Sequence, residues 1–131
     1  MSAVSWIAVG GGAALGAWLR WGLGIVLNPV FPTLPFGTLA ANLIAGLIMG
    51  LVMEFSARHA SLPPDARLLI TTGFLGGLST FSTFSAESVT LFLRREILWG
   101  VIHMSSHLVG SLALTLLGIY LVQFLFGTEA A

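Results

Sequence analysis

A run of glycines, hydroxyl residues and phenylalanines interrupts an otherwise apolar part of the chain. It reads Gly73-Phe74-Leu75-Gly76-Gly77-Leu78-Ser79-Thr80-Phe81-Ser82-Thr83-Phe84-Ser85. Lipid tolerates irregular backbone only where protein buries it or where it lines a water-filled cavity. The run therefore predicts a path or site for a solute inside the membrane, formed where a membrane-spanning helix is broken at mid-depth.

Two phenylalanines of this run have helical spacing. Phe81 and Phe84 are three residues apart, so a helix places both rings on one face. Such a pair can simply pack against another helix. Alternatively, the two rings can bind an anion, because the edge of a phenyl ring is electropositive and stabilises an anion without a full positive charge. Neighbouring hydroxyls add weak donors, and since conduction requires weak binding, these groups together suit a small, hard anion.

Three further polar residues stand inside apolar stretches: Asn42, Arg20 and Glu87. The Asn42 amide offers two donor hydrogens and one acceptor oxygen, so it either coordinates an anion or ties two helices together. Arg20 would cost about 3 kcal/mol at the centre of a bilayer; it either snorkels to the surface or attracts anions to a vestibule. Glu87 is protonated, hydrogen-bonded to hydroxyls, or part of the path.

The last apolar stretch carries a polar stripe, formed by His103, His107, Ser111 and Thr115. Two histidines four residues apart have the spacing of metal ligands on a helix. The sequence shows no third ligand with suitable spacing and no His-Glu-x-x-His pattern, so we expect no metal site here. Residues four apart share a helix face, and the stripe therefore either lines a pore or binds a neighbouring helix.

The composition places these residues in a membrane. Hydrophobic residues make up 56% of the 131 positions and charged residues only 8%, whereas a soluble domain carries roughly 25% charged residues. The chain is therefore an integral membrane protein of one domain, surrounded by lipid. It has no cysteine, which excludes disulfides and thiolate metal sites, and a net charge of zero, which gives no reason to expect a nucleic-acid partner. No nucleotide-binding motif and no nucleophile–base pair is evident, so we expect no enzyme.

Four stretches of the chain are long enough to cross the hydrocarbon, which takes about 20 apolar residues per helix. They predict an all-α integral membrane fold, a single four-helix transmembrane domain over residues 1–131 with spans at about 4–26, 36–55, 66–93 and 97–126. The first stretch ends before Asn28-Pro29, a pair that favours a turn. It also runs past the length of a secretory signal, so we expect it to be retained as a span. Gly46 and Gly50 form a small-xxx-small pair that lets helices approach closely.

The arginines are balanced between the two sides of the membrane. With four spans, Arg58 and Arg67 lie on one side and Arg94 and Arg95 on the other, and the chain has no lysine. Orientation follows the Lys/Arg difference between the sides, so this balance predicts insertion both ways up and an antiparallel dimer of opposite copies. The alternative is that Arg20 decides one orientation. Because four helices enclose little volume, we expect a transport path to need the second subunit.

The glycine–hydroxyl–phenylalanine run, with Asn42 upstream and Gly16-Ala17-Trp18-Leu19-Arg20 in the first span, resembles the Fluc (CrcB) family of fluoride channels. The resemblance covers all four spans. It implies a dual-topology homodimer of antiparallel subunits with two fluoride pores. It also implies a bacterial plasma (inner) membrane protein that passively exports cytoplasmic fluoride.

The same resemblance assigns expected roles to individual residues. Phe81 and Phe84 would face fluoride with their ring edges, and Asn42 would donate its amide N–H to the ion. The polar track along the pore would be formed by Ser82, Ser111 and Thr115.

A second set of expected roles concerns the break in the third span. The carbonyls of Gly76 and Ser79 would hold a structural Na⁺ at the dimer interface. The family often has threonine where this chain has Ser79, but a backbone ligand should survive that change. Glu87 resembles a family glutamate near one pore end.

Two other classes of protein remain open on the sequence. A small proton-coupled multidrug antiporter also has four spans, but its mechanism needs a membrane-embedded carboxylate, typically in the first span. The first span here has no Asp or Glu, and Glu87 stands in the wrong span. In a structural or assembly subunit, the hydroxyl–aromatic run would only join helices, and changing Phe81 or Asn42 would alter assembly rather than flux.

Overall fold

The computed structural model describes residues 1–59 and 61–127, and within these ranges all regular structure is helical. The elements are α1 (Ala3–Leu27), η1 (Asn28–Val30), α2 (Phe36–Arg58), α3 (Pro64–Leu68), η2 (Leu69–Leu75), α4 (Gly76–Leu78), α5 (Phe81–Leu93) and α6 (Ile97–Phe126). The all-α prediction is therefore confirmed for this part of the chain. The first helix ends at Leu27, directly before the Asn28-Pro29 pair, as predicted.

Three helical stretches are long and apolar enough to cross a membrane, namely Phe36–Arg58, Pro64–Leu93 and Ile97–Phe126. They correspond to the second, third and fourth predicted spans. The helix at the first predicted span, α1, has 25 residues, which is about 37 Å of helix at the usual rise per residue. Its glycines and tryptophans lower its hydropathy, and its crossing of the membrane stays a prediction.

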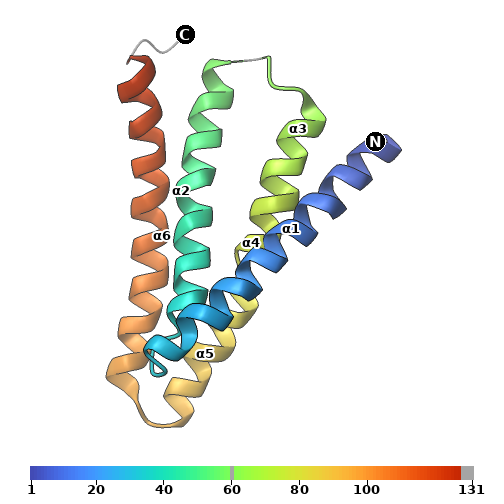
Figure 1. Ribbon diagram of the computed structural model, residues 1–131. Helices are drawn as coiled ribbons and strands as arrows, with labels where there is room; N and C mark the ends of the chain where they lie inside the picture. Colours follow the sequence, from blue (N-terminus) through green and yellow to red (C-terminus); the bar gives the residue numbers. More distant parts are fainter. Residues whose placement is uncertain (60, 128–131) are drawn as a thin grey trace.

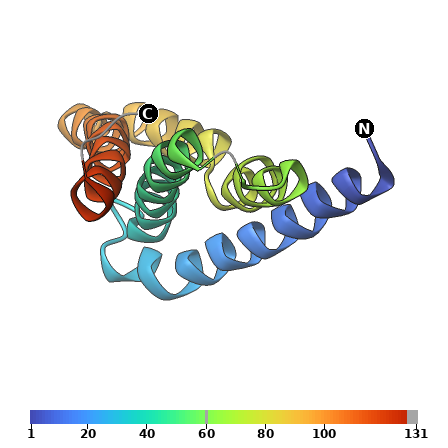
Figure 2. The same cartoon turned by 90° about the horizontal axis from the view of Figure 1, so that it is seen from above.

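Helices α2 and α6 lie side by side and antiparallel, and α1 crosses the third span diagonally (Figure 1; Figure 2 shows it from above). The close approach of α2 to α6 depends on the predicted glycine pair. A Cβ atom at Gly50 would overlap the carbonyl oxygen of Thr115, and one at Gly46 would lie 2.9 Å from that of Ser111. Only glycine fits at such contacts, and these two positions therefore fix which face of α6 meets α2.

The contact of α1 with the third span is equally close. A Cβ atom at Gly12 or Gly16 would overlap backbone oxygens of η2, and one at Gly77 would overlap the backbone of Ala13. Gly10 and Gly11, in contrast, face open space. The glycines of α1 thus let this helix pack directly against η2 and α4, the part of the third span that precedes the break.

The break in the third span lies at Ser79 and Thr80. Both residues are extended, with φ/ψ of −77°/152° and −147°/116°. Helix α5 then begins at Phe81, where the Thr80 hydroxyl accepts a hydrogen bond from the Thr83 N–H at 3.2 Å and caps the helix. The predicted break is present, but it is shorter than the glycine run, because the glycines before it remain in η2, which is π-helical, and in α4.

Candidate functional site

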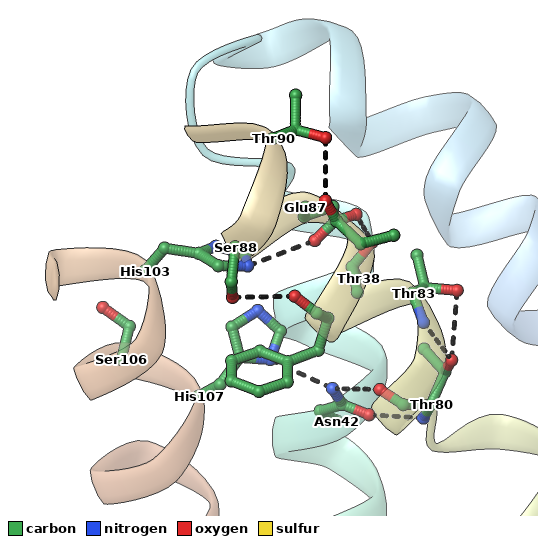
Figure 3. Close-up of polar contacts among 12 residues, drawn as sticks. Thr38, Asn42, Thr80, Thr83, Glu87, Ser88, Thr90, His103, Ser106 and His107 are labelled. Carbon is green, nitrogen blue, oxygen red and sulfur yellow. Dashed lines mark hydrogen bonds and ion pairs between the residues drawn. The ribbon is translucent and has the colours of Figure 1, made fainter. Parts of the chain in front are cut away.

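Asn42, in the second turn of α2, holds the break of the third span at two points. Its Nδ2 donates to the Thr80 carbonyl oxygen at 3.1 Å, and its Oδ1 accepts from the Thr80 N–H at 2.7 Å (Figure 3). The amide oxygen therefore satisfies the Thr80 N–H, whose helical bond the break removes. Of the two roles open to Asn42 on the sequence, the helix tie is present in the structure.

The second hydrogen of the Asn42 amide reaches His107 on α6, with 3.0 Å between Nδ2 and Nδ1. The two bonds to Thr80 fix which end of the amide is nitrogen, so His107 Nδ1 faces a donor and must accept. In a neutral imidazole the proton then sits on Nε2. That atom is buried and has no hydrogen-bond partner among the described residues.

A cavity of about 460 Å³ opens between α2, the break and α6. Seven residues predicted for the site line it: Asn42, Gly76, Ser79, Phe81, Phe84, Ser111 and Thr115. His107, which was predicted only as part of a polar stripe, lines it as well. Two predicted residues, Ser82 and Glu87, do not.

The rings of Phe81 and Phe84 share a face, as the spacing predicts. Their centroids are 5.4 Å apart, and the Phe84 ring lies 4.8 Å from His107 and is stacked on His103 at 5.6 Å. Phe84 is half-buried in this aromatic cluster, whereas the Phe81 side chain is 80% exposed on the subunit surface. Phe81 is thus placed to meet a partner or lipid as well as the cavity.

The hydroxyls of the predicted polar track have different positions. Thr115 Oγ1 shares its one hydrogen between the carbonyl oxygens of Gly46 at 3.0 Å and Ser111 at 2.9 Å, so it has no free hydrogen to donate to an ion in the cavity. Ser82 is exposed, outside the cavity, with its Oγ 3.4 Å from Thr80 Oγ1. Ser111 remains in the cavity lining.

Glu87 on α5 does not line the cavity; it joins a second polar group together with Thr38 and His103. Its Oε1 accepts from Thr38 Oγ1 at 2.6 Å, and its Oε2 lies 3.4 Å from His103 Nε2 (Figure 3). Thr38 is positioned at the start of α2, where Asn28 Oδ1 accepts from the N–H groups of Gly37 at 2.8 Å and Thr38 at 3.3 Å. The sequence reasoning missed Thr38, although it stands four residues before Asn42 and so shares its helix face.

A third candidate metal ligand lies close to the two histidines of α6, although no residue at a suitable spacing was visible in the sequence. Glu87, His103 and His107 each offer one ligand atom, and these atoms all lie within 4.8 Å of one another. The third ligand comes from α5 and not from α6. Spacing along a single helix could not reveal it, because it depends on how α5 packs against α6.

Arg20 donates from Nε to the carbonyl oxygen of Gly77 at 3.0 Å. It therefore bonds to the backbone just before the break and does not only extend to the membrane surface. It also lines a second cavity of about 300 Å³, together with Thr38, Thr80 and Thr83. The guanidinium thus lies beside the break, at this second cavity.

The carbonyls of Gly76 and Ser79 have both lost their usual helical donors. In an α-helix the N–H of residue i+4 would bond to each. Here the Thr80 N–H bonds to Asn42 and the Thr83 N–H to the Thr80 hydroxyl. Both residues are exposed on the subunit surface, and carbonyl oxygens freed in this way are ligands that alkali cations accept.

A small helical membrane protein with a broken span, in which aromatic rings, an amide and hydroxyls meet at one cavity, belongs to the class of membrane channels and transporters. Comparison with known proteins identifies the family. Residues 7–119 match the family model described as CrcB-like protein, Camphor Resistance (CrcB).

Curated relatives agree with this match. A fluoride-specific ion channel FluC of Nitrosospira multiformis is 59% identical over 118 residues, covering 90% of this chain and 92% of the relative. The protein of the same name from Ralstonia pickettii is 57% identical, covering 94% and 98%, and that from Thiobacillus denitrificans is 55% identical, covering 92% and 98%. The chain therefore belongs to the CrcB (Fluc) family; it is a multi-pass protein of the inner membrane and not an enzyme.

Proposed function

We propose that this protein is a fluoride channel that passively exports cytoplasmic fluoride. The observation that carries the proposal is the cavity between α2, the break and α6, to which Asn42, Phe81 and Phe84 all contribute. Relatives at 50–59% identity over nearly the whole chain carry the name fluoride-specific ion channel. A passive channel suffices for export, because a membrane potential that is negative inside drives anions outward.

The proposed selectivity rests on weak donors. The cavity offers two phenyl rings, the Asn42 amide and the Ser111 hydroxyl, and among the described residues no lysine or arginine lines it. A full positive charge would hold a small anion too tightly for conduction, whereas weak donors let it enter and leave. Fluoride, which is small and hard, gains most from short contacts with such donors, and a larger halide gains less.

The functional unit we propose is an antiparallel homodimer with two pores. Three observations on one subunit support it. The cavity is open at the subunit surface, Phe81 is 80% exposed, and Gly76 and Ser79 are exposed beside it. A second copy packed against this face would close the path, and the balanced arginines permit that copy to insert upside down.

A structural Na⁺ at the centre of this dimer is a further part of the proposal. Gly76 and Ser79 are exposed residues whose carbonyl oxygens have lost their helical donors; such oxygens fit an alkali ion, and two antiparallel copies would contribute them from both sides. The ion would stabilise the break and the interface. It would take no part in moving fluoride.

Sodium should therefore raise the thermal stability of the dimer. We expect a higher melting temperature in NaCl than in choline chloride of equal concentration, because an ion that binds only the assembled state stabilises it by mass action. Potassium chloride at the same ionic strength is the control for general salt effects. Identical melting temperatures in all three salts would contradict the sodium site and leave the fluoride channel untouched.

Fluoride efflux from liposomes tests the function itself. Vesicles containing the purified protein are loaded with KF and KCl, and fluoride- and chloride-selective electrodes follow both ions after valinomycin is added. We expect fast fluoride release with little chloride release, and no release from protein-free vesicles. Dimeric, reconstituted protein that releases no fluoride would contradict the channel and favour a structural subunit. Release that depends on a proton gradient would favour an antiporter.

A further inference from the structure

Three buried side-chain atoms beside the phenylalanines face one another without hydrogen-bond partners among the described residues: Glu87 Oε2, His103 Nε2 and His107 Nε2. Their neighbourhood is largely closed, since His103 is 2% and His107 5% exposed. Buried polar atoms in folded proteins almost always have partners, and three that converge on one point call for an explanation. The fluoride path as proposed does not use Glu87 or His103.

We propose that Glu87, His103 and His107 form a binding site for a zinc-like divalent metal ion. Two imidazole nitrogens and one carboxylate oxygen are a ligand set that Zn²⁺ takes with a fourth position left open. Ligand atoms about 2 Å from a tetrahedral ion lie roughly 3.3 Å from one another. The 3.4 Å between His103 Nε2 and Glu87 Oε2 matches that spacing.

The third ligand has to move and to change its tautomer. All three ligand atoms lie within 4.8 Å of one another, so closing onto an ion takes a shift of about 1 Å or more. In the metal-free protein Asn42 donates to His107 Nδ1, which leaves the proton on Nε2. Binding through Nε2 moves this proton to Nδ1 and breaks the bond to Asn42. Glu87 and His103 therefore form the primary pair, and His107 joins at the expense of one hydrogen bond.

Because the tautomer of His107 depends on Asn42, a substitution at Asn42 tests the metal site. In Asn42→Asp, the carboxylate can still accept from the Thr80 N–H, but it now faces His107 Nδ1 with an acceptor. The proton then belongs on Nδ1, and Nε2 is free for the metal. A carboxylate behind a histidine ligand also raises its basicity, and such partners change metal affinity about 10- to 100-fold. Asn42→Asp should therefore bind zinc more tightly than the wild type.

Direct binding is the first test. The purified chain, with any affinity tag removed, is titrated with ZnCl₂ by calorimetry, and with CoCl₂ while the visible spectrum is followed. We expect one ion per chain with a Kd in the micromolar range and, for cobalt, the intense visible bands of a tetrahedral nitrogen–oxygen site. No heat of zinc binding up to 1 mM, or only the pale spectrum of octahedral cobalt, would overturn the proposal without any variant being needed.

Variants locate the site. Glu87→Gln and His103→Gln should weaken zinc binding at least about tenfold, and Asn42→Asp should strengthen it by a similar factor. His59→Gln is the matched control, because His59 is the remaining histidine of the chain and lies at the other end of α2, near Phe55 and Phe126. Equal zinc affinity in His103→Gln and the wild type, or loss of binding in His59→Gln alone, would overturn the assignment.

The consequence for transport rests on the proposed function and is tested separately. His107 lines the cavity, and its ring centroid lies 4.8 Å from that of Phe84, so an ion bound there places a divalent charge beside the proposed path. Such a charge would trap fluoride, and micromolar zinc should slow fluoride efflux from liposomes at least about tenfold in the wild type but not in His103→Gln. Zinc binding without inhibition of efflux would confirm the metal site but show that it does not lie on the fluoride path. Because zinc binding is measured without fluoride, failure of the channel proposal would leave the metal-site proposal intact.

Discussion

Replacing Phe84 with isoleucine is expected to reduce fluoride efflux at least about tenfold while leaving the dimer intact. Isoleucine keeps an apolar side chain of similar length but has no electropositive ring edge. If the ring edge stabilises the ion by about 1.5 kcal/mol, its loss corresponds to about a factor of ten in rate. Phe81→Ile should act in the same direction. Efflux from liposomes and the oligomeric state in detergent are measured on the same preparation.

The matched control is Phe124→Ile. Phe124 stands near the end of α6 and is 85% exposed, close to the exposure of Phe81, but it lies away from the cavity. Removal of this exposed ring should leave efflux unchanged. Full fluoride efflux in both Phe81→Ile and Phe84→Ile would remove the rings from the mechanism. A loss of the dimer in these variants would instead favour a purely structural role for the aromatic cluster.

Replacing Asn42 with aspartate is expected to have an even larger effect on flux. The side chain keeps its shape and can still accept from the Thr80 N–H, which retains one of its two bonds to the break, whereas the donation to the Thr80 carbonyl oxygen is lost. It places a negative charge in the proposed path, however. A like charge about 4 Å from the anion costs on the order of 4 kcal/mol at an effective dielectric constant of 20, which corresponds to roughly a thousandfold loss of fluoride flux.

Gln123→Glu is the control for an added negative charge. Gln123 lies near the end of α6, where its Nε2 donates to Glu54 Oε1 at 3.4 Å, outside the cavity. Fluoride efflux of this variant should match the wild type. Rapid fluoride efflux through Asn42→Asp would place the ion away from Asn42. In that case the asparagine would act only as the tie between α2 and the break.

The helix tie limits how Asn42 could also donate to an anion, the other role that the sequence left open. Oδ1 and one hydrogen of Nδ2 bond to Thr80, and the second hydrogen points to His107. An amide offers only these two hydrogens. For Asn42 to donate to fluoride, the ion must displace one of its present acceptors, and the His107 bond is the one whose loss leaves the break in position.

The sequence by itself determined the membrane environment, the helical fold, the family and the break in the third span. These features follow from short stretches of the sequence or from its overall composition. Hydropathy depends only on composition within a window, and the glycine–hydroxyl run signals a break whatever surrounds it. Helical spacing also placed Phe81 and Phe84 on one face, because a helix repeats every 3.6 residues.

Only the tertiary structure decided which polar groups meet. Thr115 donates its hydrogen to the backbone of α2, and Ser82 lies outside the cavity, although both were predicted for one polar track. Glu87 meets His103 because α5 packs against α6. Such contacts depend on how two helices cross; for α2 and α6 the crossing is set by close approaches at Gly46 and Gly50. Residue spacing within one helix carries no information about the rotation of its neighbour, and for that physical reason neither the positions of Thr115 and Ser82 nor the meeting of Glu87 with His103 could be predicted from the sequence.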